Sequence, residues 1–274
     1  MMPYICPICQ TPLLQLLTAQ SYECSNKHRF DIAKEGYVNL LPAQYKKSKE
    51  PGDSKEMMRA RRNFLEAGFY QPLAQAITHV IDQHLAHIAK PHILDMGCGE
   101  GYYSRQIELL AQHDNLDLYG LDIAKNAILA AAKKQPAAHF IVASSERMPY
   151  SDAYFNLLLR VYAPSNNHEI KRLLKTKGYL LTVTPGPRHL WQLKEFIYQD
   201  AKEHDTQAPL PEGFANIASQ RVRYTITPDQ EQRMALLQMT PFAWRATEPA
   251  THAIQQAQDL EIETDFTLTL AVKN

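Results

Sequence analysis

The stretch HILDMGCGEGY, residues 92–102, constrains the fold of this 274-residue chain more than any other feature. A short apolar run ends in Asp95, and glycines follow at alternate positions, Gly97, Gly99 and Gly101. This order predicts a buried strand that meets a helix through a tight loop. Glycine suits such a loop because backbone that touches a ligand has no room for Cβ and often needs a positive φ. Dinucleotide-binding folds also begin with a strand and a glycine-rich loop.

Two details favour a different ligand. The spacing is G-x-G-x-G rather than G-x-G-x-x-G, and Asp95 lies two residues before the first glycine. An acid there repels a pyrophosphate but suits the ammonium group of an amino-acid-bearing cofactor, so we predict S-adenosylmethionine (SAM). Asp122 ends the next apolar run, 21 residues past Gly101, where a carboxylate accepts the hydroxyl groups of a ribose. The alternative, a glycine turn followed by an acidic helix cap, leaves the combination of loop and two acids unexplained.

From His92 onward, strand-like runs alternate with helical patterns. Strands are expected at His92–Met96, Leu116–Asp122, His139–Ala143, Phe155–Tyr162 and Tyr179–Thr184, and helices at Tyr102–Gln112, Ala124–Lys134 and Asn167–Lys175. Such units predict an α/β fold with a doubly wound, mostly parallel, Rossmann-like sheet, as in class I SAM-dependent methyltransferases. Phe266–Val272 is expected to be a closing edge strand that can run antiparallel. Ligands then lie at the carboxyl ends of the strands.

A second motif, C-x2-C-x14-C-x3-H, comprises Cys6, Cys9, Cys24 and His28. Thiolates and an imidazole at these spacings can close a tetrahedral zinc site, and four protein ligands leave no open position, which indicates a structural metal. In a reducing cytoplasm this reading is favoured over disulfides or free thiols. A module this short buries little hydrophobic core of its own. A bound metal would therefore supply the stability that the core does not provide. Cys98 is expected to be a packing residue.

Charge is unevenly distributed, although the whole chain has a formal net charge of zero. Residues 27–62 contain ten Lys or Arg and five Asp or Glu. This asymmetry indicates either a polyanionic partner or a solvated linker. The candidate phosphate contacts are Lys46, Lys47, Arg59, Arg61 and Arg62. We divide the chain into a zinc-binding module (1–36), a basic linker and helix (37–70) and a methyltransferase domain (71–274).

The distribution of apolar residues along the sequence does not suggest a membrane protein. No apolar run approaches the length that crosses a bilayer, and the N-terminus lacks a basic segment followed by an apolar one. We therefore expect a cytoplasmic protein.

Over essentially its whole length the chain resembles the bacterial 23S ribosomal RNA guanine-N1 methyltransferases. The most specific segments are AKEGYVNLLP (33–42), residues 95–103 and residues 184–190, and residues 238–244 are also similar. The resemblance implies a zinc module that recognises RNA, joined to a domain that transfers a methyl group from SAM to N1 of a guanine in a hairpin loop of 23S rRNA. It does not say which of the neighbouring guanines is used.

The resemblance also carries over residue by residue. Cys6, Cys9, Cys24 and His28 match the ligands of one zinc ion per chain. Gly99 and Glu100 match the SAM-contacting loop, and Tyr70 and His189 match two further SAM contacts. At Lys177-Gly178 the chain departs from the two glycines that methyltransferases often carry there, which bears on one turn only.

The catalytic groups are less evident. Guanine N1 carries a proton that must leave, and a hydrogen-bonding or positive group near O6 would stabilise the resulting charge. Arg160 and Tyr162, at the end of an expected strand, are candidates for this role, with packed edge residues as the alternative. Two other functions remain open: a small-molecule methyltransferase, and a non-enzymatic SAM- or RNA-binding protein. A homodimer would widen the RNA-binding face, but no residue indicates one.

Overall fold

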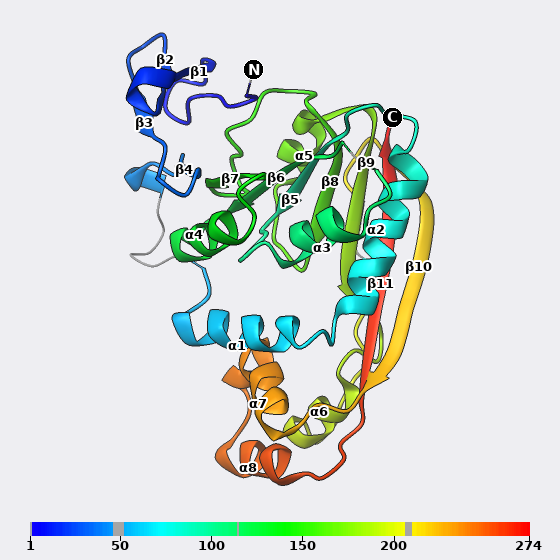
Figure 1. Ribbon diagram of the computed structural model, residues 1–274. Coiled ribbons are helices and arrows are strands. Elements are labelled where there is room, and N and C mark those ends of the chain that lie inside the picture. The colour runs from blue at the N-terminus through cyan, green and yellow to red at the C-terminus, as the bar shows by residue number, and fades with distance from the viewer. Residues whose placement is uncertain (1, 46–51, 114, 206–209) are drawn as a thin grey trace.

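The computed structural model describes residues 2–45, 52–113, 115–205 and 210–274. The predicted phosphate contacts Lys46 and Lys47 lie outside these ranges. Two sheets organise the described chain, a three-stranded sheet of order β1-β2-β3 and an eight-stranded sheet of order β10-β11-β9-β8-β5-β6-β7-β4 (Figure 1).

The large sheet is mostly parallel, as predicted. Its strands are β4 (Val38–Asn39), β5 (His92–Met96), β6 (Asp117–Asp122), β7 (His139–Val142), β8 (Phe155–Val161), β9 (Leu174–Pro185), β10 (Phe214–Ile226) and β11 (Ile262–Lys273). Pairings from β4 through β9 are parallel, and β11 pairs antiparallel with both β9 and β10. From β5 the chain builds outward to β6 and β7, then returns to place β8 and β9 on the other side. The carboxyl ends of β5 and β8 therefore form the crevice in which such folds bind ligands.

Helices cover both faces of this sheet, so alternate residues of the central strands pack in different cores. Ile93 and Leu157 pack in a core with α2 (Gln71–Leu85) and α3 (Tyr102–Leu110). Leu94 and Leu158 pack in a second core with α5 (Asn167–Leu173). Helix α4 (Lys125–Lys134) packs against Phe140 in a third. Burial on both faces explains the nearly continuous apolar runs of these strands.

The N-terminal module contains β1 (Leu13–Leu16), η1 (Leu17–Ala19), β2 (Ser21–Cys24) and β3 (Arg29–Asp31). It does not stand apart from the large domain. Tyr4, Leu13 and Tyr22 share the second core with Tyr150 and Phe155, and Tyr4 forms an antiparallel bridge with Tyr150. The short helix η2 (Ala43–Tyr45) follows β4 in the chain. The core that it shares with the large domain thus supports the module.

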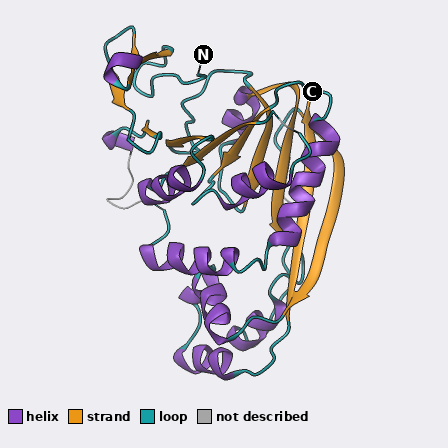
Figure 2. Ribbon diagram, in the orientation of Figure 1, coloured by secondary structure: helices purple, strands orange, loops and turns teal. Residues whose placement is uncertain are grey.

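A group of helices lies beyond one end of the large sheet (Figure 2). It comprises α1 (Lys55–Glu66), α6 (Trp191–Ile197), α7 (Gln230–Gln238), η3 (Pro241–Trp244) and α8 (Glu248–Gln256). The N-cap of α1 is Ser54, whose Oγ accepts a hydrogen bond from the amide of Met57 at 3.2 Å. This layer places α1 and η3 over the crevice.

Two features differ from the sequence expectations. The run 266–272 belongs to β11, which is antiparallel but lies inside the sheet, and the edge strand is β10. Residues 216–221 of β10 are exposed and mostly polar, so they show no alternation of buried and exposed positions that would have marked a strand. Helix α8 was also not expected. In the part of the chain that the structure describes, we find no helix with the length and apolar character needed to traverse a bilayer.

Candidate active site and metal centre

The four residues of the N-terminal Cys-His motif converge. Their ligand atoms all lie within 4.8 Å of one another. The Sγ atoms of Cys9 and Cys24 are 3.7 Å apart, and His28 Nδ1 lies 3.4 Å from Cys24 Sγ and 3.5 Å from Cys6 Sγ. Ligands about 2.3 Å from a central zinc would be separated by about 3.7 Å along the edges of a tetrahedron. The cluster therefore has the size and the donor set of a structural zinc site. Cys98 is buried elsewhere, in the glycine loop.

The glycine loop connects β5 to α3 with three residues in the left-handed region. Gly97, Gly99 and Gly101 have φ values of 69°, 55° and 72°. At Gly97 a Cβ would lie 2.7 Å from the Cβ of Ala163, so the loop approaches the end of β8 as closely as only glycine allows. A Cβ at Gly99 would meet nothing within 4 Å, because this residue borders open space.

The two predicted acids flank this loop. Asp122, at the end of β6, accepts hydrogen bonds from the amides of Gly99 at 3.0 Å and Ala124 at 2.8 Å. Each of its oxygens retains a second lone pair. Asp95 is buried and accepts a hydrogen bond from the hydroxyl of Ser104 at 2.8 Å. Burial raises the pKa of Asp95 to about 7, and the nearby charge of Asp122 contributes in the same direction. A cationic partner would restore the ionised form of this carboxyl.

A cavity of about 1040 Å³ opens beside the loop. Seven of the eight predicted cofactor contacts line it: Tyr70, Asp95, Gly97, Gly99, Glu100, Asp122 and His189. Gly101 does not; it precedes α3, and a Cβ there would lie 3.3 Å from the Phe140 ring. Pro7, from between the first two cysteines, also lines the cavity. The glycine loop and the zinc module therefore border the same space.

Glu100 is already engaged. It forms a two-pronged ion pair with Arg62 of α1, in which Arg62 Nε lies 2.6 Å from Glu100 Oε2 and the second contact joins Nη2 to Oε1. Nearby, Glu66 of the same helix pairs with Arg105 and Lys134, each at 2.7 Å. These ion pairs hold α1 against the glycine loop.

The basic residues of α1 therefore do not form one free surface. Arg61 pairs with Asp53 at 2.8 Å, donates to the carbonyl of Met239 and lines the cavity, as does Arg62. Arg59 is exposed and does not line it. Of the three predicted phosphate contacts on this helix, only Arg59 lies away from the cavity.

Tyr70 and His189 meet on the opposite wall. Tyr70 is buried, with its ring 4.9 Å from that of Phe266 and 6.3 Å from that of His189. His189 follows the turn after β9, and its Nδ1 accepts a hydrogen bond from the amide of Asp265 at 3.2 Å. Burial lowers the pKa of His189 to about 3, so the ring is neutral. With Nδ1 as acceptor, the ring proton lies on Nε2.

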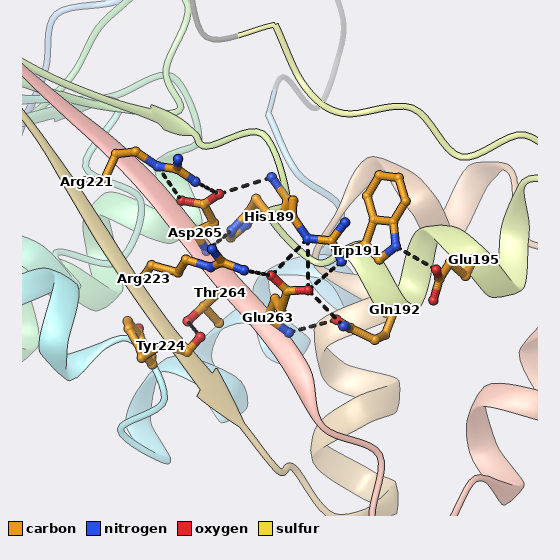
Figure 3. Close-up of polar contacts among 11 residues, drawn as sticks. His189, Trp191, Gln192, Glu195, Arg221, Arg223, Tyr224, Glu263, Thr264 and Asp265 are labelled. Carbon is orange, nitrogen blue, oxygen red and sulfur yellow. Dashed lines mark hydrogen bonds and ion pairs between the residues drawn. The ribbon is translucent and has the colours of Figure 1, made fainter.

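Ion pairs between β10, β11 and the turn fix this wall (Figure 3). The amide of Arg188 donates to Asp265 Oδ2 at 3.0 Å, and Arg221 holds the same carboxylate from β10. Glu263 pairs with both Arg188 and Arg223. The pKa of Glu263 falls to about 2, mainly because Arg188 donates to it. His189 thus projects from a turn that charged side chains of two strands keep in place.

The two catalytic candidates occupy different positions. Arg160 donates to Ser165 Oγ at 2.8 Å and Thr182 Oγ1 at 3.2 Å and does not line the cavity. Tyr162 does line it, and its Oη lies 3.5 Å from His189 Nε2. Its φ of 54° is rare for a bulky residue, and such strain is often found at functional sites.

Sequence reasoning missed several residues that line the cavity. His204 lies in a polar loop with no motif around it, and Tyr45 and Arg147 contact each other across 102 residues of chain. Only three-dimensional proximity identifies these residues.

A parallel sheet with a glycine loop, two acids at neighbouring strand ends and a four-ligand cluster defines a class I SAM-dependent methyltransferase with a zinc-binding module. Family comparisons agree: residues 4–49 match the model described as "RlmA, N-terminal", a zinc ribbon, and residues 89–240 match a methyltransferase domain. The protein is an enzyme whose cofactors are SAM and zinc.

Two relatives cover most of the chain. The 23S rRNA (guanine(748)-N(1))-methyltransferase of Streptomyces fradiae is 31% identical over 87% of this chain and 85% of its own. YxjB of Bacillus subtilis, named as a candidate 23S rRNA (guanine-N(1)-)-methyltransferase, is 32% identical over 98% of this chain and 96% of its own. Among solved structures, the YcgJ protein of Bacillus subtilis matches 72% of this chain and 97% of its own with a TM-score of 0.47 and 18% identity. By its identity to these full-length relatives, the chain belongs to the 23S rRNA guanine-N1 methyltransferase family.

Proposed function

We propose that this enzyme transfers a methyl group from SAM to N1 of a guanine in 23S rRNA, and that the target lies in a hairpin loop. The observation that carries the proposal is the single cavity bordered both by the glycine loop and by Pro7 of the zinc module. A cavity with these two walls accommodates a small donor at one end and a base presented with its RNA at the other. A base in a loop also costs less to unstack than one in a duplex.

SAM fits the residues at the loop. The backbone of Gly97 and Gly99 would lie against the donor, the free lone pairs of Asp122 would accept the ribose hydroxyls, and Asp95 would pair with the ammonium group. Tyr70 and His189 would close the opposite wall. Bound SAM supplies an activated methyl group, and the protein contributes alignment of the acceptor nitrogen with the methyl carbon and sulfur.

Glu100 would have two partners in this proposal. In the structure it binds Arg62, whereas the family resemblance assigns it to the cofactor. Since a carboxylate accepts several hydrogen bonds, Glu100 can keep Arg62 while accepting one from the donor. Arg62 would then orient Glu100 and connect α1 to the state of the cofactor site.

Zinc would be held by Cys6, Cys9, Cys24 and His28, within a module of residues 1–36. Residues 37–70 would form the basic linker and helix, and residues 71–274 the methyltransferase domain. The zinc module and Arg59 would contact phosphates, which makes RNA affinity dependent on salt. Because its proposed substrate is ribosomal RNA, we propose that this enzyme acts in the cytoplasm. A homodimer would widen the RNA-binding face; sedimentation of the free enzyme tests it.

The test is methyl transfer from labelled SAM to 23S rRNA from a strain that lacks the modification, compared with a panel of small-molecule acceptors. We expect label in the rRNA and none in the small acceptors. Label in a small acceptor alone would favour a small-molecule methyltransferase, and SAM binding without any transfer would favour a non-enzymatic role.

A further inference from the structure

His204 is a cavity-lining histidine that none of the assignments above uses. It lies between α6 and β10, and its backbone amide donates to the carbonyl of Pro187 at 2.9 Å, which ties it to the turn that carries His189. The two imidazole rings have centroids 6.5 Å apart, and the His189 and Tyr162 rings are 6.0 Å apart. Three hydrogen-bonding rings thus follow one another along this wall.

The two nitrogens of His204 differ in their surroundings. Nε2 is buried and has no hydrogen-bond partner among the described residues. The backbone of His189 beside the ring favours its protonation, and we place the proton of the neutral ring on Nδ1. With its proton on Nδ1, the ring carries its free lone pair on Nε2. A buried acceptor without a partner is costly and is expected to meet a donor when the site fills.

His189 presents the opposite polarity. Its Nδ1 accepts the amide hydrogen of Asp265, so its Nε2–H is a donor (Figure 3). One wall of the cavity therefore offers a donor at His189, whose Nε2–H also lies 3.5 Å from Tyr162 Oη, and at His204 an acceptor without a partner among the described residues. The lactam edge of guanine is complementary, since N1–H is a donor and the adjacent O6 is an acceptor. Adenine has the reverse order at N1 and its exocyclic amine.

We propose that His204 Nε2 is the general base that accepts the N1 proton of the target guanine, while His189 Nε2–H donates to O6. This inference rests on the proposed function. As N1 bonds to the methyl carbon, the carbon–sulfur bond breaks and its electron pair stays on sulfur. The N1–H pair forms the new bond to carbon, and the proton moves to His204. S-adenosylhomocysteine, 1-methylguanine and a His204 imidazolium result, and the imidazolium then loses its proton to water.

Charge is conserved within the site during this step, because the positive charge lost from the sulfonium appears on the imidazolium. Among the described residues, the groups that act on the His204 ring include Lys194 on α6, Asp265 on β11 and His189 on the turn. Burial lowers the pKa of His204 and Lys194 acts in the same direction, while the His189 backbone and Asp265 oppose them. The ring is therefore neutral and able to accept a proton at neutral pH.

The test compares His204→Gln with His252→Gln, a substitution at an exposed histidine of α8, in the full-length zinc-loaded enzyme. Single-turnover methylation of unmodified rRNA, SAM affinity and thermal unfolding are measured for each. At pH 7 we expect His204→Gln to slow methylation by about 100-fold or more, the usual range for loss of a general base, with SAM affinity and unfolding unchanged. His252→Gln should match the wild type.

The pH profile separates a base from a structural residue. In His204→Gln the rate should keep rising with pH and approach that of the wild type at high pH, where guanine N1 loses its proton unaided. A deficit that stays constant across pH, or an equal loss of SAM affinity, would overturn the proposal. The function itself is judged separately by the wild type: if the wild type methylates guanine N1, a fully active His204→Gln refutes only the role of His204.

Discussion

The proposed pairing of the buried acid Asp95 with SAM would make SAM affinity depend on pH in a way that can be worked out from the surroundings of Asp95. Its carboxyl is almost fully enclosed, and burial raises its pKa to about 7 in the free enzyme. Only the ionised carboxyl pairs with the ammonium group of SAM. Below pH 7 the free enzyme must therefore release a proton when SAM binds.

The magnitude follows from this pKa. At pH 6 about a tenth of the free molecules carry the carboxylate, so the Kd for SAM should be about tenfold weaker than its plateau above pH 8, equivalent to about 1.4 kcal/mol. Because the folded-state pKa lies above the unfolded one, Asp95 also contributes stability that is present below about pH 4 and lost as the pH rises through 7. SAM should therefore stabilise the enzyme more at pH 8 than at pH 6.

Isothermal titration calorimetry between pH 5.5 and 8.5, in buffers of different ionisation enthalpy, measures both the affinity and the protons released. Asp95→Asn should bind SAM weakly at every pH, without the slope between pH 6 and 8. Glu108→Gln, at an exposed acid of α3 outside the cavity, should keep the wild-type profile. An unchanged slope in Asp95→Asn would refute the reasoning and turn attention to Asp122, whose pKa burial also raises.

Four further predictions concern other parts of the site. Cys24→Ser should lose zinc and lower the unfolding temperature of the N-terminal module; metal analysis that finds full zinc in this variant would contradict the ligand assignment. Asp122→Ala should weaken SAM binding by about 100-fold, because it removes the acceptor of the ribose hydroxyls, a loss of about 1–3 kcal/mol for each hydrogen bond; normal affinity would exclude the ribose role. Arg59→Ala should weaken RNA binding only, whereas Arg62→Ala should alter SAM affinity as well by releasing Glu100; equal effects of the two would contradict the division of α1. The free energy of unfolding should fall as pH decreases from about 6.5, because the unfolded state protonates His189 and the folded state, with a pKa of about 3, does not; His189→Gln should reduce this slope in urea titrations, by up to about 1.4 kcal/mol per pH unit.

Much of the fold could be predicted because its signals are local. The glycine loop, Asp95 and Asp122 each lie at the end of a run that is buried on both faces, and such runs are apolar throughout. The spacing of the N-terminal cysteines and His28 likewise predicts the cluster of four ligand residues that the structure shows.

What the sequence did not reveal depends on contacts between distant segments. Arg62 and Glu100 are 38 residues apart, and only the fold shows that a helix predicted to contact RNA also contacts the glycine loop. The N-terminal module shares a core with Tyr150, a contact that no local pattern encodes. Of β10, only the second half, Arg221–Ile226, was expected to be a strand. Residues 216–221 are exposed on both faces, so they are not selected for alternation.

The central claim is that SAM and a guanine of 23S rRNA meet in the cavity between the glycine loop and the zinc module. Nucleoside analysis of rRNA methylated by the purified enzyme, by digestion and mass spectrometry with primer extension to locate the site, tests it most directly. We expect 1-methylguanosine at one position in a hairpin loop, lost in Asp122→Ala. A methyl group on another atom or base, or modification spread over many positions, would contradict the account.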